Sequence, residues 1–313
     1  MVQKILSSPQ LEEQYPGCFE IYKYMLSKRG DGIKHHLQTH MTRFIKRNSK
    51  FVKEIESIFS QYQEKESMHH FFKSKTVRAS IKELQRELHT TYSQFQSSHD
   101  SKKEQLLEQE ESINSLLNIH KSTQERIKSY DEIYSYLHSH HIPSLEIVGK
   151  NSSLTILDIG CGMNPLSIET FIENSNSKIS ASSLKWIGCD VHEEDMKYLT
   201  KCYKKYGFQG EFFSCDLTRE DDREKINSLN ADILFAFKVL DSLEHIQRNI
   251  SFEILKELNY KIGVISFATY SLGRRKKIPI TKRAWILKFL EKEKWKYSIY
   301  ETDNEAYIIY TKN

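Results

Sequence analysis

The segment 154-LTILDIGCGMNPLSI-168 decides the fold, because an apolar run passes directly into two glycines and an Asn-Pro pair. A short apolar run bounded by turn residues is typical of a buried strand in a parallel sheet. Glycines directly after such a strand let the backbone approach a ligand closely, and the helix that follows offers free N–H groups to a polar moiety. The segment therefore predicts a ligand site at the carboxyl end of the first strand.

Strands and helices alternate from Leu154 onward, which predicts a parallel sheet with crossover helices. The expected strands are 154–159, 184–190, 210–215, 231–238 and 261–268, and the expected helices lie near 166–175, 193–206, 220–229, 242–259 and 281–293. The segments WKYSIYE and EAYIIYTK flank a short turn, which predicts a C-terminal antiparallel hairpin. We therefore expect an α/β, Rossmann-like fold with a seven-stranded, mostly parallel sheet.

The first half of the chain is expected to be an all-α region. Residues 11–141 contain almost no Gly or Pro after Gly32, and apolar residues recur at spacings of three, four and seven. Gly30 and Gly32 are expected to separate the first two helices. The stretch 143–153 then links the helical half to the sheet.

Composition favours a soluble, cytoplasmic protein and leaves open whether its partner is anionic. The 313 residues contain no apolar run of about 18 residues, and the first residues MVQKILSSPQLEEQYPG show no apolar segment before a small-residue cleavage site. The five cysteines include no C-x-x-C pair, as expected of reduced thiols. The net charge is +4, and residues 1–80 hold 14 Lys and Arg against 8 Asp and Glu. This excess fits a polyanion such as RNA and fits a solvated helix face equally well.

The glycine motif fits S-adenosylmethionine (SAM) better than a dinucleotide. A dinucleotide fingerprint needs a third glycine where this chain has Pro165, whereas Asp158 before the glycines gives the Asp-x-Gly-x-Gly form of SAM-dependent methyltransferases. Asp190 ends the second strand and suits ribose hydroxyls, and Asp216 follows the third and suits the adenine amino group. Three carboxylates would repel a pyrophosphate and favour a cationic sulfonium. The alternative is that all three cap strand-to-helix turns.

Four segments resemble the aminoglycoside-resistance 16S ribosomal RNA (guanine-N7) methyltransferase family, the Arm/Rmt group. They are IHKSTQERIKSYDEIYSYL (119–137), ILDIGCGMNPLSI (156–168), ADILFAFKVLDSLE (231–244) and VISFATYSLGRRKK (264–277). The Asn-Pro after the glycines is more distinctive than the glycines themselves. The resemblance covers about residues 70–313 and implies a class I SAM methyltransferase domain.

The resemblance also implies a set of cofactor-binding residues. Arg126 would bind the methionine carboxylate beside His120, and Lys238 would face the target base as a candidate catalytic residue. The remaining SAM contacts would be Asp158, Gly160, Cys161, Gly162, Asn164 and Pro165 at the floor, Asp190 and Val191 at the ribose, and Asp216 and Leu217 at the adenine. The alternative for His120 and Arg126 is a capped, salt-bridged helix start at Ser122–Glu125.

The sequence lacks features that other methyl acceptors require. No Asn/Asp-Pro-Pro-aromatic segment follows strand four, where the chain has FKVLD, and no cysteine nucleophile follows strand four or five. Guanine N7 carries an in-plane lone pair and no proton, so its methylation needs no general base. Catalysis would then consist of alignment and exclusion of water.

The loop after strand five is the expected RNA contact. Its candidate residues are Ser271, Arg274, Arg275, Lys276, Lys277, Lys282 and Arg283. Clustered cations at the open end of the sheet would bind phosphates, although a solvated loop is the alternative. The family resemblance implies that residues 69–118 form a helical ribosome-docking domain before the methyltransferase domain at 119–313, with 1–68 as an extra helical module.

We therefore expect a SAM-dependent methyltransferase of guanine N7 in small-subunit ribosomal RNA, acting as a monomer on the assembled subunit. Transfer RNA or another structured RNA is the alternative substrate, and a non-catalytic RNA-binding assembly factor is the alternative of another class. Both antibiotic resistance and housekeeping ribosome maturation fit the sequence. We expect no metal site, and His36 and His40 are expected to be surface histidines.

Overall fold

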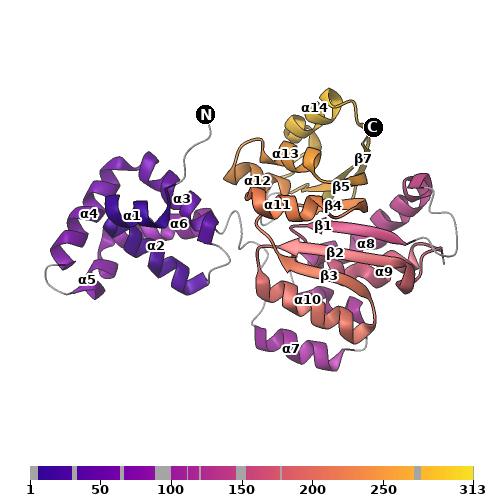
Figure 1. Ribbon diagram of the computed structural model, residues 1–313, viewed down its shortest axis with the longest axis horizontal. Coiled ribbons are helices and arrows are strands. Elements are labelled where there is room, and N and C mark those ends of the chain that lie inside the picture. Colours follow the sequence, from indigo (N-terminus) through magenta and orange to yellow (C-terminus); the bar gives the residue numbers. More distant parts are fainter. Residues whose placement is uncertain are drawn as a thin grey trace. The chain divides into compact units, whose positions relative to one another are not determined.

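The computed structural model describes residues 6–29, 34–63, 67–88, 100–110, 112–119, 121–145, 153–176, 178–270 and 276–312. The chain forms two compact units, Met1–Gln94 and Phe95–Asn313 (Figure 1). No helix among these residues is long and apolar enough to span a lipid bilayer.

The N-terminal unit is a bundle of short helices around one apolar core. Its described helices are α1 (Ser8–Gln14), α2 (Pro16–Arg29), α3 (Lys34–Arg47), α4 (Ser49–Gln63), α5 (Met68–Lys73) and α6 (Lys75–Leu88). Phe71, Val77 and Leu84 from α5 and α6 belong to the same core as Ile55 and Phe59 of α4. The expected boundary at 68/69 therefore lies inside this unit, because these helices share one apolar core.

The expected boundary at 118/119 likewise lies inside the second unit. The 3-10 helix η3 (Ile113–Ile119) contributes Leu116 and Leu117 to the core beneath the sheet. The helix α7 (Asp100–Gln109) also belongs to this unit, since its Lys103 pairs with Asp195 at 2.5 Å. The sequence missed this division because the periodicity of a helix does not show which core the helix joins.

One seven-stranded sheet organises the second unit, in the order β3-β2-β1-β4-β5-β7-β6. The strands are β1 (Leu154–Ile159), β2 (Leu184–Asp190), β3 (Gln209–Ser214), β4 (Ala231–Phe237), β5 (Tyr260–Ala268), β6 (Lys296–Glu301) and β7 (Glu305–Thr311). The first five are parallel, and β7 is antiparallel to both β5 and β6. This topology confirms the predicted Rossmann-like fold with its C-terminal hairpin.

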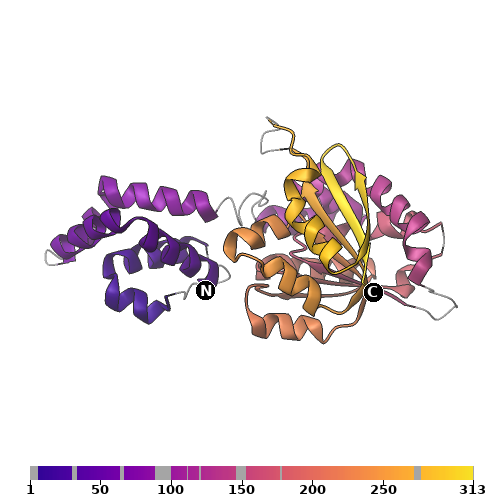
Figure 2. The ribbon, with the colours of Figure 1, turned by 90° about the horizontal axis from the view of Figure 1, so that it is seen from above.

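Helices cover both faces of the sheet, in agreement with the continuous apolar strands. The first face packs against α8 (Lys121–His140), α9 (Ile168–Glu173) and α10 (Glu193–Tyr206). The second packs against α11 (Glu220–Asn227), α12 (Leu240–Ile246), α13 (Ile250–Glu257) and α14 (Ala284–Lys292). Figure 2 shows α14 beside the C-terminal hairpin, both in yellow. Further 3-10 turns are η4 (Ile142–Leu145), η5 (Asn164–Ser167), η6 (Ala181–Ser183) and η8 (Ile280–Arg283).

The single helix predicted for 242–259 is wrong, because two helices, α12 and α13, occupy this region. Asn249 adopts a left-handed conformation with φ of +68° between them. The carboxylate of Glu244 accepts hydrogen bonds from the backbone N–H groups of Asn249, at 2.7 Å, and Ser251, at 3.0 Å. These bonds satisfy donors at the start of α13 and stabilise the break without glycine or proline.

The carboxyl ends of β1 to β5 lie along one edge of the sheet, here called the carboxyl edge. The antiparallel strand β7 begins at the same edge, because Glu305 pairs with Ala268 at the end of β5. The carboxyl edge therefore combines turns after parallel strands with the first residue of β7.

Replacing Gly263 by Ala is expected to destabilise the sheet unit by about 1–3 kcal/mol, the usual effect of overpacking. A Cβ at Gly263 would lie 2.2 Å from Cζ of Tyr310, its cross-strand partner. Denaturant unfolding followed by tryptophan fluorescence measures this, because Trp186, Trp285 and Trp295 all lie in this unit.

The same substitution in a Tyr310→Leu background provides the control. If the ring causes the clash, Gly263→Ala should destabilise the Tyr310→Leu variant less than it destabilises the wild type. An equal loss of unfolding free energy in both backgrounds would contradict the steric explanation.

Candidate functional site

The loop after β1 is held against the end of β2 by hydrogen bonds. Gly160 and Gly162 have φ of +59° and +49°, a left-handed conformation that favours glycine. A Cβ on Gly160 would lie 2.5 Å from Cγ2 of Val239. The backbone N–H of Cys161 donates to the Cys189 carbonyl at 3.1 Å, so the loop continues the contact between the two strands.

Asp190 and Asp216 stand at the ends of neighbouring strands, as the sequence predicted. The Asp190 carboxylate accepts from the N–H of Gly162 at 3.0 Å and from the N–H of His192 at 3.2 Å. Asp216 accepts from the N–H and the hydroxyl of Thr218, at 3.0 and 2.6 Å. Both carboxylates thus order turns, as the capping alternative requires. Both side chains are only half-buried, and a carboxylate oxygen can accept more than one hydrogen bond.

Asp158 lies beneath the loop and is fully buried. Its Oδ2 accepts from Nδ2 of Asn164 at 2.8 Å and from Nε1 of Trp186 at 3.3 Å, while Oδ1 has no hydrogen-bond partner among the described residues. Burial raises the pKa of Asp158 to about 7, although these two hydrogen bonds and the charge of Arg126 act in the opposite direction. Asp158 therefore supports the loop from below.

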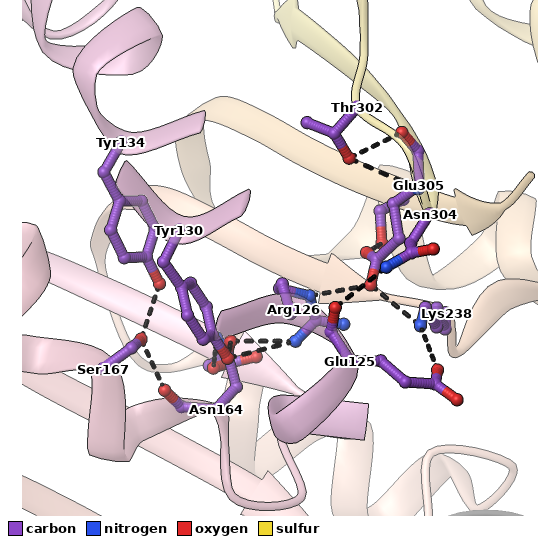
Figure 3. Close-up of polar contacts among 12 residues, drawn as sticks. Glu125, Arg126, Tyr130, Tyr134, Asn164, Ser167, Lys238, Thr302, Asn304 and Glu305 are labelled. Carbon is purple, nitrogen blue, oxygen red and sulfur yellow. Dashed lines mark hydrogen bonds and ion pairs between the residues drawn. The ribbon is translucent and has the colours of Figure 1, made fainter. Parts of the chain in front are cut away.

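Arg126 is held by contacts from several parts of the sheet unit (Figure 3). Its side chain is 2% exposed. Nε pairs with Oε1 of Glu305 at 2.9 Å, and Nη1 donates to Oδ1 of Asn164 at 3.1 Å. The hydroxyl of Tyr130 donates to the same Asn164 oxygen at 2.8 Å. Cζ of Arg126 lies 4.8 Å from the centroid of the Phe237 ring. Arg126 therefore forms its salt bridge with Glu305 of β7, at the carboxyl edge.

Lys238 joins the same group of charges. It follows β4 with a φ of +57°, a conformation that costs roughly 1–2 kcal/mol for a residue with a Cβ. Its Nζ lies 2.9 Å from Oε1 of Glu305 and 3.3 Å from Oε2 of Glu125. Burial alone would raise the pKa of Glu305, but the charges of Arg126 and Lys238, with hydrogen bonds from Lys238 and Ser266, lower it to about 2. Glu305 is therefore an ionised carboxylate in the interior.

The sequence did not identify Glu305, Tyr130 or Glu125 as site residues. A signal for Glu305 was present, because it directly precedes the apolar run AYIIY of the predicted C-terminal hairpin. A buried carboxylate must be paired with cations or hydrogen-bond donors. The sequence did not show which cations, since Arg126 and Lys238 lie far from Glu305 along the chain.

The other predicted cofactor-binding residues include two backbone hydrogen-bond acceptors and two buried side chains. The carbonyl of Pro165 accepts from the Tyr203 hydroxyl at 2.7 Å, and the Val191 carbonyl accepts from Ser214 at 3.3 Å. Cys161 and Leu217 are buried, and burial raises the pKa of the Cys161 thiol well above its usual value. His120 lies outside the described residues.

The predicted RNA contacts divide into three groups. Ser271, Arg274 and Arg275 lie outside the described residues. Lys276, Lys277 and Lys282 are exposed. The prediction for Arg283 is wrong: its side chain is buried, and Nη2 pairs with Oδ2 of Asp241 at 3.0 Å.

The prediction that His40 is a surface histidine is also wrong. It is 4% exposed because it lies on the inward face of α3, between Leu37 and Phe44. The side chain of His36 lies outside the described residues. Among the residues that the structure describes, no group of three potential metal ligands is present.

The raised pKa of Asp158 predicts a specific pH dependence of stability. Since an unfolded Asp titrates near pH 4, the folded chain holds a proton that the unfolded chain releases between about pH 4 and pH 7, so the unfolding free energy falls as pH rises through this window. In Asp158→Asn the side chain at this position does not titrate, so the variant should not lose this part of the unfolding free energy as pH rises. The variant should gain about 1 kcal/mol per pH unit relative to wild type between about pH 5 and pH 7, measured by denaturant unfolding. A difference that stays constant with pH would contradict the assignment.

Comparisons with known proteins identify the family of this chain. The profile of the family described as ribosomal RNA methyltransferase (FmrO) matches residues 108–309. A protein of Serratia marcescens named 16S rRNA (guanine(1405)-N(7))-methyltransferase is 28% identical over 165 residues, which cover 53% of this chain and 56% of that protein. The chain spans about half the length of the curated relatives it matches.

Two solved structures share the fold. An rRNA methylase from Escherichia coli has a TM-score of 0.59 at 17% identity, covering 95% of this chain and 100% of its own. The 16S rRNA methyltransferase RmtF, solved in complex with S-adenosyl-L-homocysteine, has a TM-score of 0.55 at 20% identity, covering 82% of this chain and 91% of its own. The family profile covers more than half of the chain and confirms the family resemblance noted in the sequence. The chain therefore belongs to the FmrO family of ribosomal RNA methyltransferases.

Proposed function

We propose that this protein is a SAM-dependent methyltransferase that modifies N7 of a guanine in 16S-type ribosomal RNA of the small subunit, in the cytoplasm. One observation supports this proposal above all. At the carboxyl edge of this FmrO-family chain, a glycine loop and two half-buried carboxylates lie at the ends of three adjacent strands. The curated relatives are named 16S rRNA (guanine(1405)-N(7))-methyltransferases, which supports the choice of base and acceptor atom.

The donor set at this edge fits SAM. The Asp190 carboxylate would accept the ribose hydroxyls while keeping its bonds to Gly162 and His192, and Asp216 with Leu217 would border the adenine. Arg126 would bind the methionine carboxylate, and Asn164 holds its guanidinium in place at 3.1 Å. Asp158 would stay below the loop, where its contacts with Asn164 and Trp186 fix the floor. SAM supplies an activated methyl group on a sulfonium.

The residues of this chain then contribute orientation and exclusion of water. Guanine N7 offers a lone pair and no proton, so no side chain has to accept a proton during the transfer. Lys238 lies at the end of β4, on the side where we expect the base to enter, and its ammonium is held by Glu125 and Glu305. We propose that Lys238 orients the base by donating a hydrogen bond to guanine O6 on its major-groove edge, which leaves the N7 lone pair free to react.

We propose that RNA phosphates contact cations of both units. In the sheet unit these are the exposed Lys276, Lys277 and Lys282. In the N-terminal unit, exposed cations on α3 to α6 include Lys46, Lys50, Lys73, Lys75 and Arg78. Since α5 and α6 share one core with α2 to α4, we assign docking on the subunit to the whole N-terminal unit rather than to residues 69–118. Such contacts should weaken as the salt concentration rises.

Incubation with SAM labelled in the methyl group tests the reaction directly. The substrates are assembled small subunits, protein-free 16S-type ribosomal RNA and transfer RNA, each in a separate reaction. We expect label in small-subunit RNA, and strand scission by aniline after borohydride reduction at the modified guanine. Label in transfer RNA alone would contradict the proposed substrate, and label without scission would contradict N7 as the acceptor.

Asp190→Ala is expected to weaken SAM binding about 10- to 100-fold, because two hydrogen bonds to a carboxylate would be lost. Isothermal titration calorimetry with SAM in the absence of RNA measures this. Glu211→Ala is the matched control, since Glu211 is an exposed acidic residue on the neighbouring strand β3. Equal SAM affinity of the Asp190 variant and wild type would contradict the ribose contact.

A further inference from the structure

One carboxylate oxygen is shared by two cations from different parts of the site. Oε1 of Glu305 lies 2.9 Å from Nε of Arg126 and 2.9 Å from Nζ of Lys238. The side chains of Arg126, Lys238 and Glu305 are 2%, 8% and 1% exposed, so water screens this triad only weakly. Figure 3 shows Glu305 between the two cations, which come from α8 and from the end of β4.

The position of this carboxylate is fixed by its surroundings. Oε2 accepts from the hydroxyl of Ser266 on β5 at 2.7 Å. The turn before β7 is closed by a bond from the Thr302 N–H to the Glu305 carbonyl at 2.9 Å. The side-chain amide of the preceding residue, Asn304, donates to the Glu125 carbonyl at 3.0 Å, and its backbone carbonyl accepts from the Thr269 N–H at 3.0 Å. The turn therefore links α8, β5 and β7 around Glu305.

We propose that Glu305 is a positioning residue that couples the cofactor-side guanidinium of Arg126 to the target-side ammonium of Lys238. The inference rests on the function proposed above. A stronger contact of Oε1 with one cation weakens its contact with the other. A ligand that binds Arg126 and changes the Arg126–Glu305 contact therefore also changes the contact between Glu305 and Lys238. Binding of SAM and presentation of the base are thereby linked through one oxygen atom.

Glu305 also balances charge during the transfer. As the carbon–sulfur bond breaks and the carbon–N7 bond forms from the N7 lone pair, one positive charge passes from the sulfur to the base. Without a counter-ion, the ammonium of Lys238 beside the base would repel this positive charge. The carboxylate of Glu305 offsets that repulsion. Loss of the Glu305 charge should therefore lower both the affinity for SAM and the rate of transfer.

Glu305→Gln keeps the shape of the side chain and removes its charge. We expect about tenfold or greater losses in SAM affinity, by calorimetry, and in kcat with small subunits. Glu301→Gln is the control, because Glu301 is an exposed glutamate on the adjacent strand β6 and should behave like wild type. Glu305→Gln activity and affinity equal to those of Glu301→Gln would overturn the proposal.

A double-mutant cycle separates coupling from simple structural loss. Lys238→Met should change SAM affinity in the wild-type background and have little effect in the Glu305→Gln background. If the effects of the two single substitutions on SAM affinity multiply to within about twofold of the effect of the double substitution, the two residues act independently and the proposal is overturned. If the wild type itself binds no SAM, the proposed function fails, which is a different outcome from additivity.

A measurement on the Arg126 side chain covers the case in which Glu305→Gln does not fold. In protein labelled with ¹⁵N-arginine, the Nε–H signal of Arg126 is assigned by its loss in Arg126→Lys. Lys238→Met should shift this signal, because Oε1 of Glu305 would then contact Nε alone. An Nε–H signal that is unchanged in Lys238→Met would overturn the shared-oxygen coupling.

Discussion

The guanidinium of Arg126 lies in the interior of the protein, and the carboxyl edge is arranged so that its charge is paired. Burial is the largest single effect and disfavours the charged form, but Glu305, Tyr130 and Tyr307 together outweigh it and raise the pKa of Arg126 well above its usual value. Removing one member of a buried ion pair typically costs about 3–5 kcal/mol. Arg126 and Glu305, together with Asn164, therefore link α8, β7 and the segment that follows the two glycines.

This pairing extends along the edge as a continuous series of polar contacts. Asp158 bonds to Asn164, Asn164 to Arg126, and Arg126 to Glu305, which also holds Lys238. The series begins on β1, passes through α8 and β7, and ends after β4, the neighbour of β1 in the sheet. A site built on such contacts is preorganised, because its groups are held before a ligand arrives. In the proposed reaction this matters because no proton transfer contributes to the rate and alignment has to supply the catalysis.

The sequence predicted the parts of the structure that depend on local patterns. The bounds of β1, β2 and α10 were correct, since apolar runs and turn residues mark them clearly. The glycine loop and the carboxylates Asp190 and Asp216 were also placed correctly at the carboxyl edge. Their turn contacts do not compete with the proposed ligand contacts, because a carboxylate has about four acceptor positions.

Features that depend on long-range pairing were missed. Glu305 acquires its role from Arg126, 179 positions away along the chain, and no local pattern reports such a partner. The same reason explains Arg283, which appeared to be part of a basic loop but pairs with Asp241 across the fold. The break between α12 and α13 was missed because the Glu244 side chain, rather than glycine or proline, produces it.

A crystal structure of the protein with S-adenosylhomocysteine tests the central claim most directly. The account predicts the nucleoside across the carboxyl ends of β1 to β3, with its ribose hydroxyls on the Asp190 carboxylate. It also predicts the amino-acid carboxylate on Arg126, whose Nε keeps its contact with Glu305. A ligand bound elsewhere, or an Arg126 that leaves Glu305 and points away from the ligand, would contradict the account.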